Sequence, residues 1–101
     1  MAALQLDAFR PQIDDFCRRW KINEFSIFGS ALRDDFGADS DVDILVTFGP
    51  DAQWSLYDWV DMRDELGRIF ARPVDLVSKK GLRNPFRRRS ILGSRRVIYA
   101  A

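Results

Sequence analysis

Residues 25–48 decide the fold of this chain, and in three successive blocks they read FSIFGS, ALRDDFGADS and DVDILVTF. The first block is a short apolar run ending in a Gly-Ser pair, which is typical of a strand that leads into a tight turn. The third block begins with two aspartates one residue apart and continues as an apolar strand. Because strand side chains alternate between faces, Asp41 and Asp43 point the same way, while Val42 points into the core.

The remaining sequence alternates helical and strand patterns around this segment. Hydrophobic spacing and breaker residues predict helices over 9–20, 31–36, 54–70 and 84–93, and strands over 24–28, 42–48 and 74–77. Residues 97–99 form either a last edge strand or an ordered tail. At 101 residues the chain has room for one core. We therefore expect a single α/β domain over residues 1–101, with a small mixed β-sheet flanked by helices.

Composition removes several classes of chemistry. The chain has no histidine, and Cys17 is its single cysteine. Disulfides within the chain, Cys/His zinc sites and histidine acid–base catalysis are therefore excluded, so carboxylates must carry any chemistry. With 47% hydrophobic and 31% charged residues, and no long apolar run or signal-type N-terminus, the sequence predicts a globular cytoplasmic protein without membrane contact.

Charge is divided unevenly along the chain. Residues 1–71 carry 7 basic and 14 acidic side chains, whereas residues 72–101 carry 9 basic side chains and one acid, Asp75. The basic segment fits a polyphosphate, a nucleic-acid backbone or an acidic protein partner. Its alternative interpretation is a solvated surface that balances an acidic body.

Three aspartates are candidate metal ligands. Asp41 and Asp43 share one strand face and can hold one Mg²⁺, a cation that takes carboxylates, phosphates and water. Asp75 lies in the next apolar strand, where a charge is costly without a metal or an ionic partner. If that strand lies beside the second, Asp75 completes a triad for two metal ions, which suits phosphoryl or nucleotidyl transfer. The alternative for Asp75 is a structural ion pair.

A phosphate site is expected just upstream. Gly29 and Ser30 follow a strand and open a helix, so backbone amides and the Ser30 hydroxyl can face a phosphate that a side chain at Gly29 would block. Arg33, one turn further on, either adds positive charge near the phosphates or pairs with nearby aspartates. The residues thus predict a site for Mg²⁺ and a nucleoside triphosphate.

These motifs closely resemble the minimal nucleotidyltransferases of the DNA polymerase beta superfamily. The resemblance rests on Gly29-Ser30, ten intervening residues, Asp41-Val42-Asp43, and Asp75 within PVDLV, and it extends over nearly the whole chain. The most similar group is the MNT-type antitoxins encoded beside HEPN-domain toxins. That resemblance implies a polymerase-beta-like nucleotidyltransferase fold and transfer of AMP from ATP to a tyrosine of the partner toxin, which silences its RNase activity.

The resemblance also implies a role for each candidate. Gly29 and Ser30 would bind the triphosphate, Asp41 and Asp43 would hold two Mg²⁺ ions, and Asp75 would complete the metal site and help activate the acceptor hydroxyl. Arg33 matches an arginine frequent in the family. The next position is often glycine there and is Asp34 here, which adds a negative charge near the phosphate turn.

Three alternatives stay open at this stage. The acceptor can be a small-molecule hydroxyl, as in aminoglycoside nucleotidyltransferases, although such enzymes carry an added substrate domain. The chain can instead neutralise its partner by contact alone. The basic segment can also bind nucleic acid directly, against which the acidic body argues.

Overall fold

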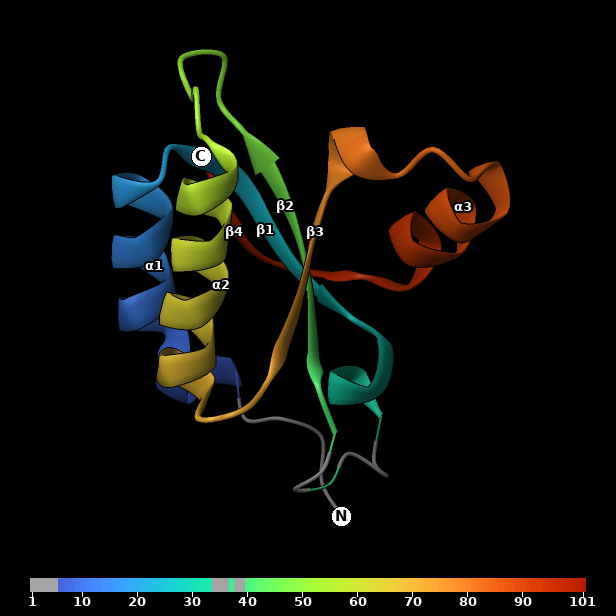
Figure 1. Cartoon of the computed structure of the whole chain (residues 1–101). Helices are drawn as coiled ribbons and strands as arrows, with labels where there is room; N and C mark the ends of the chain where they lie inside the picture. Colours follow the sequence, from blue (N-terminus) through green and yellow to red (C-terminus); the bar gives the residue numbers. More distant parts are fainter. Residues whose placement is uncertain (1–5, 34–36, 38–39) are drawn as a thin grey trace.

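The computed structural model describes residues 6–33, 37 and 40–101 of the chain. Helices and strands alternate along these residues around a central sheet (Figure 1). In chain order the elements are the 3₁₀ turn η1 (Leu6–Phe9), α1 (Arg10–Arg19), β1 (Ile22–Phe28), the 3₁₀ turn η2 (Gly29–Leu32), β2 (Val42–Phe48), α2 (Leu56–Phe70), β3 (Val74–Ser78), the 3₁₀ turn η3 (Lys79–Gly81), α3 (Pro85–Ser94) and β4 (Arg96–Ala100).

The sheet is mixed, as predicted. Within the described residues its order is β3-β2-β1-β4, with β1 antiparallel to both β2 and β4 and with β2 parallel to β3. A parallel neighbour requires a crossover connection, which α2 supplies between β2 and β3. β4 resolves the alternative for residues 97–99, because they belong to an edge strand paired with β1.

The two faces of the sheet are covered differently. α1 and α2 lie side by side on one face, and α3 lies on the other (Figure 1). The main core fills the space under α1 and α2, and among the described residues its buried members are Leu6, Ile13, Phe16, Cys17, Ile22, Phe25, Ile27, Ala31, Val42, Ile44, Val46, Met62, Leu66, Phe70, Leu76 and Ile98. A smaller cluster attaches α3 and contains Phe28, Leu45, Leu82 and Ile91.

Side-chain caps set where α2 and α3 begin. Ser55 caps α2 by accepting a hydrogen bond from the Asp58 backbone N–H, and Asp58 accepts one from the Ser55 backbone in return. α2 therefore begins at Leu56 rather than at residue 54. Asn84 caps α3 by accepting hydrogen bonds from the backbone N–H groups of Phe86 and Arg87, and Pro85 lies in the first turn, where a missing N–H costs least.

The predicted helix over residues 31–36 is wrong in the part that the structure describes. A 3₁₀ turn begins at Gly29 and ends at Leu32, and Arg33 has an extended backbone. Residues 34–36 and Asp39 lie outside the described residues, and so does the predicted effect of Asp34. None of the described helices is long and apolar enough to cross a membrane.

Candidate active site

Strand pairing brings the candidate aspartates to one side of the sheet. β2 and β3 are in register with Asp43 directly beside Asp75, and Asp41 immediately precedes β2. Val42 and Ile44 are fully buried in the main core under α1 and α2. Alternation therefore directs the aspartates to the α3 side, which confirms the prediction that Val42 and Ile44 point into the core and the aspartates point away from it.

Gly29 lies against Asp43, its closest neighbour across the turn. Its φ of +72° lies in the left-handed region, which side chains rarely adopt. A Cβ added at Gly29 would overlap Oδ2 of Asp43. The predicted role of Gly29, which is to leave room for a phosphate, stays a prediction, and the structure adds a separate need for glycine, because a side chain here would overlap the aspartate of the neighbouring strand.

Ser30 connects the turn to the start of β2. Its hydroxyl donates to the backbone carbonyl of Asp41 over 3.3 Å, and its backbone N–H donates to the Asp43 carboxylate. The turn and the two aspartates are thus tied together before any ligand arrives. A phosphate that bound this turn would compete with Asp43 for the Ser30 N–H.

Asp43 is the electrostatic centre of the site. Burial, followed by the negative charges of Asp75 and Asp41, raises the pKa of the half-buried Asp43 carboxyl, while Arg87 and the Ser30 N–H oppose the shift. Carboxylates that repel one another suit a divalent cation, which would relieve that repulsion and prefers oxygen ligands. Among the described residues, no three acidic or sulfur side chains are yet gathered closely enough to hold a metal ion. Asp41, Asp43 and Asp75 thus supply the oxygen donors that Mg²⁺ prefers, although the described structure does not gather the three carboxylates into one metal-ion site.

Asp75 differs from the expectation of a buried charge. Its side chain is exposed because β3 is an edge strand and α3 covers the sheet only further along, over Leu45 and Val77. The charge consequently needs no ion-pair partner, and none of the described ion pairs involves it. An exposed carboxylate beside Asp43 is accessible to an incoming acceptor group.

Arg87 lies near the candidate site, and no pattern in the sequence singled it out. It lies in the first turn of α3 and interacts electrostatically with Asp43. Ile91, one turn later, is buried in the cluster that fixes α3 to the sheet. The sequence does place Arg87 and Ile91 on one helix face, because residues four apart share a face. The position of Arg87 could still not be predicted without knowing which face of α3 meets the sheet.

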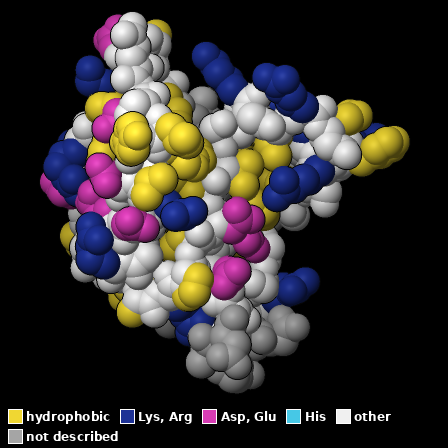
Figure 2. All heavy atoms as spheres, in the orientation of Figure 1, with side chains coloured by type: hydrophobic (Ala, Val, Ile, Leu, Met, Phe, Trp, Pro, Cys, Tyr) yellow, Lys and Arg dark blue, Asp and Glu magenta, His cyan; other side chains and the backbone are white. Residues whose placement is uncertain are grey.

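The rest of the basic segment is only partly free surface. Arg72 donates to the Gly37 carbonyl, Arg88 donates to the Lys79 carbonyl over 3.0 Å, and Arg95 pairs with Glu24. Figure 2 shows basic side chains over α3 and a group of acidic side chains beside them on the same face. Some basic side chains of the segment therefore stabilise the fold through hydrogen bonds and an ion pair, and others lie beside the acidic side chains.

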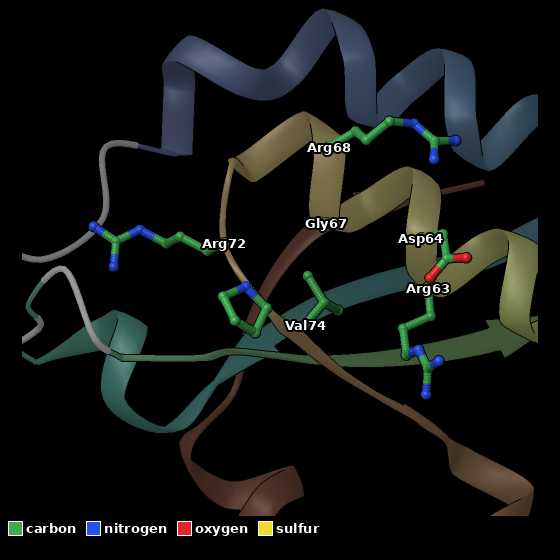
Figure 3. A pocket seen from close by; sticks show the side chains of 7 residues that line it. Arg63, Asp64, Gly67, Arg68, Arg72 and Val74 are labelled. Carbon is green, nitrogen blue, oxygen red and sulfur yellow. The ribbon is translucent and has the colours of Figure 1, made fainter.

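A separate hollow between α2 and the start of β3 does not belong to this site. It is lined by Arg63, Asp64, Gly67, Arg68, Arg72, Pro73 and Val74. In Figure 3 the three labelled arginines point in different directions rather than toward one point. The hollow also lies on the α2 side of the sheet, because Val74 packs against the main core while Asp75 faces the other way.

The sheet, the Gly-Ser turn and the aspartates define a nucleotidyltransferase. The model of the family described as "Nucleotidyltransferase domain" matches residues 10–98, and the chain belongs to this family. A relative from Methanocaldococcus jannaschii, named as a candidate protein adenylyltransferase, is 32% identical over 73 residues, which cover 72% of this chain and 73% of the relative. The protein adenylyltransferase MntA of Thermococcus cleftensis is 36% identical over 66 residues, 65% of each chain.

Solved structures agree on the fold. One described as a candidate minimal nucleotidyltransferase has a TM-score of 0.74 and 31% identity, with 90% of each chain covered. A toxin–antitoxin structure with AMP-PNP has a TM-score of 0.73 at 17% identity, covering 91% of this chain and 73% of the other. The tri-AMPylated Shewanella oneidensis HEPN toxin in complex with MNT antitoxin gives 0.66 at 18% identity, covering 96% and 74%. The predicted polymerase-beta-like minimal nucleotidyltransferase fold is thus confirmed.

Proposed function

We propose that this chain transfers AMP from ATP to a hydroxyl of a partner protein, which would be a HEPN-type toxin that the transfer silences. The single observation that carries the proposal is the register of β2 and β3, which sets Asp43 beside Asp75 next to the Gly29 turn. Relatives named as protein adenylyltransferases, and a solved neighbour described as an AMPylated HEPN toxin with its MNT antitoxin, support the choice of acceptor.

Each site residue has a proposed role in that reaction. Asp41, Asp43 and Asp75 would hold two Mg²⁺ ions, which when bound would neutralise phosphate charge and lower the pKa of the acceptor hydroxyl. The hydroxyl oxygen forms a bond to the α-phosphorus while the bond to pyrophosphate breaks. Asp75, whose carboxylate is exposed, would take the hydroxyl proton.

Binding of the triphosphate would involve the turn and two arginines. Gly29 leaves room beside Asp43, and Ser30 offers its backbone N–H. Arg33 is exposed just after the turn, and Arg87 approaches from α3 on the side of Asp43. Positive charge on both sides of the aspartates suits a polyanion, because it lowers the repulsion between triphosphate and carboxylates.

Intact-mass spectrometry tests the proposal directly. The purified chain, a HEPN-type candidate partner, ATP and Mg²⁺ are mixed, and we expect AMP-sized additions on the partner. Asp43→Ala should lower the rate by at least about 100-fold, on the scale of losing a transition-state electrostatic contact. The proposal fails if the partner gains no mass, or if Asp43→Ala behaves as wild type.

Neutralisation by contact alone is the competing outcome of the same experiment. A double Asp41→Asn/Asp43→Asn variant removes both charges without adding volume. If that variant still inhibits the partner's RNase activity as strongly as wild type in the presence of ATP, transfer is not the inhibitory step. If inhibition is lost while the two proteins still bind each other, transfer is required.

A further inference from the structure

An apolar groove lies at the end of the sheet away from the aspartates. It has a volume of about 520 Å³ and is lined by Val46, Thr47, Phe48, Gly49, Pro50, Ala52, Trp54, Ser55, Leu56, Trp59, Ser78, Lys79 and Lys80, which together we call the α2 groove. β2 runs two residues beyond its last pairing with β3, at Val46 and Ser78. This overhang leaves the groove open between the end of β2, the start of α2 and η3.

The aromatic walls of the groove are held in place. Trp54 donates its indole N–H to the Trp20 carbonyl over 2.9 Å, and Phe48 packs edge-on against Trp59 with ring centroids 6.2 Å apart. The Ser55 capping box fixes the first turn of α2 beside them. A preformed aromatic surface loses little conformational entropy when a partner docks on it.

One exposed apolar side chain lies at the rim of the groove and a second follows it in the chain. Leu56, which lines the groove, is 77% exposed, and Tyr57, which is outside the lining, is 84% exposed; both belong to the first turn of α2. Figure 2 shows apolar side chains grouped over the start of α2, on the same face as the acidic and basic groups beside α3. Exposed aromatic and aliphatic groups that adjoin a pocket are typical of protein-binding surfaces.

The charges around the groove indicate what it binds. Its lining contains Lys79 and Lys80 but no acidic residue. The nearest acid on α2, Asp58, is occupied by the capping box with Ser55. The η3 turn that presents the lysines is fixed, because Arg88 donates to the Lys79 carbonyl. A complementary segment therefore carries apolar side chains for the aromatic walls and carboxylates for the lysines.

We propose that the α2 groove is the docking surface for the acceptor protein, which inserts a segment of apolar and acidic side chains there. The inference rests on the proposed transfer to a protein hydroxyl. Phe48 is five residues along β2 from Asp43, a span of about 17 Å at the usual rise of a strand. A partner anchored in the groove can thus reach the aspartates around the edge strand β3, and ATP can bind without touching the groove.

Leu56→Asp tests the groove, and Phe86→Asp is its control. Both residues lie in the first turn of a helix, and they are 77% and 84% exposed, so each change removes an exposed apolar side chain and places an anion where a helix start tolerates it. The dissociation constant for a purified HEPN-type partner is measured by calorimetry without ATP or Mg²⁺. Because Leu56 lines the groove, we expect Leu56→Asp to weaken binding at least 10-fold, and Phe86→Asp to change it less than twofold.

A charge-reversal variant and the AMP-transfer assay distinguish the remaining outcomes. Lys80→Glu should weaken partner binding and flatten its salt dependence, while the KM for ATP stays at the wild-type value. Equal partner affinity for Leu56→Asp and wild type overturns the inference, as does an equal loss in Phe86→Asp. Self-association of the wild-type chain that Leu56→Asp abolishes, seen by sedimentation, also overturns it. If binding is weakened as expected but no AMP is transferred by wild type, the proposed function fails and the docking surface stands.

Discussion

The two faces of one sheet have opposite character, although β2 contributes to both. On the side of α1 and α2, Ile44, Val46 and Met62 are fully buried in a continuous apolar core. On the side of α3, alternate positions of the strands hold the aspartates, and the buried Ser26 hydroxyl has no hydrogen-bond partner among the described residues. Unsatisfied buried polar groups and facing carboxylates cost stability. The first face thus supplies the stability that allows the second to hold destabilising groups for chemistry.

Replacing one buried isoleucine by alanine on each face of the sheet should give the largest difference in stability between the two faces. Ile44→Ala opens a cavity in the main core and should lower the free energy of unfolding by about 4 kcal/mol, whereas Ile91→Ala acts on the small α3 cluster and should cost about 2 kcal/mol. Urea unfolding measures both. Ile91→Ala should also raise the KM for ATP, because α3 carries Arg87. Equal stability losses would break the distinction between the faces.

Glycine replacement probes the contact between the turn and Asp43. Gly29→Ala meets both the left-handed backbone and the Asp43 carboxylate, so we expect a stability loss of about 2 kcal/mol and a fall in AMP transfer. Gly93 is the control, because a Cβ there meets nothing within 4 Å. Since alanine favours helices, Gly93→Ala should leave transfer unchanged and stabilise by up to about 1 kcal/mol. Thermal unfolding and the transfer rate distinguish the two, and an active Gly29→Ala variant would contradict the proposed geometry.

Features that depend on the local period of the sequence could be predicted, whereas features that depend on how the elements pack against one another could not. The alternation of Asp41, Val42 and Asp43 follows from strand geometry, so the direction of the aspartates could be predicted. The exposure of Asp75 could not, because it depends on β3 being an edge strand that α3 leaves uncovered. Similarly, the contact of Gly29 with Asp43 depends on the β1–β2 register, which sets Phe28 opposite Asp43.

The same dependence on tertiary packing explains why the surroundings of Arg33 and Arg87 were not predicted. Arg33 was expected one turn into a helix, but the turn after β1 ends at Leu32. Arg87 was counted only as part of a basic segment, since its proximity to Asp43 depends on how Ile91 and Leu82 pack α3 against the sheet. Hydrophobic patterning located α3 as a helix but gave no information on which strand residues it covers.

Arg87→Ala should have a smaller effect, which is confined to ATP binding. Loss of its charge near Asp43 should raise the KM for ATP about 10-fold with little change in kcat, which corresponds to about 1.4 kcal/mol. Arg89→Ala, an exposed arginine of the same helix, is the control and should change the KM less than twofold. Steady-state kinetics with varied ATP separates binding from turnover. If Arg87 only neutralises the free aspartates, its removal would tighten Mg²⁺ binding and leave the KM for ATP unchanged.

The pH dependence of stability should have opposite signs on the two faces. Burial and neighbouring charges raise the pKa of Asp43, so just above the usual carboxyl range the folded state keeps a proton that the unfolded state releases, and stability falls as pH rises. The Arg19 hydrogen bond lowers the pKa of Glu65 on α2, so its contribution is present at neutral pH and is lost as pH falls through the lowered value. Asp43→Asn should therefore be more stable than wild type at pH 7, and Glu65→Gln less stable, with both differences shrinking toward pH 3. Because both carboxyls are partly exposed, solvent screening keeps each effect within about 1 kcal/mol. Urea unfolding across this range measures both, and differences of the same sign would contradict the electrostatic contrast between the faces.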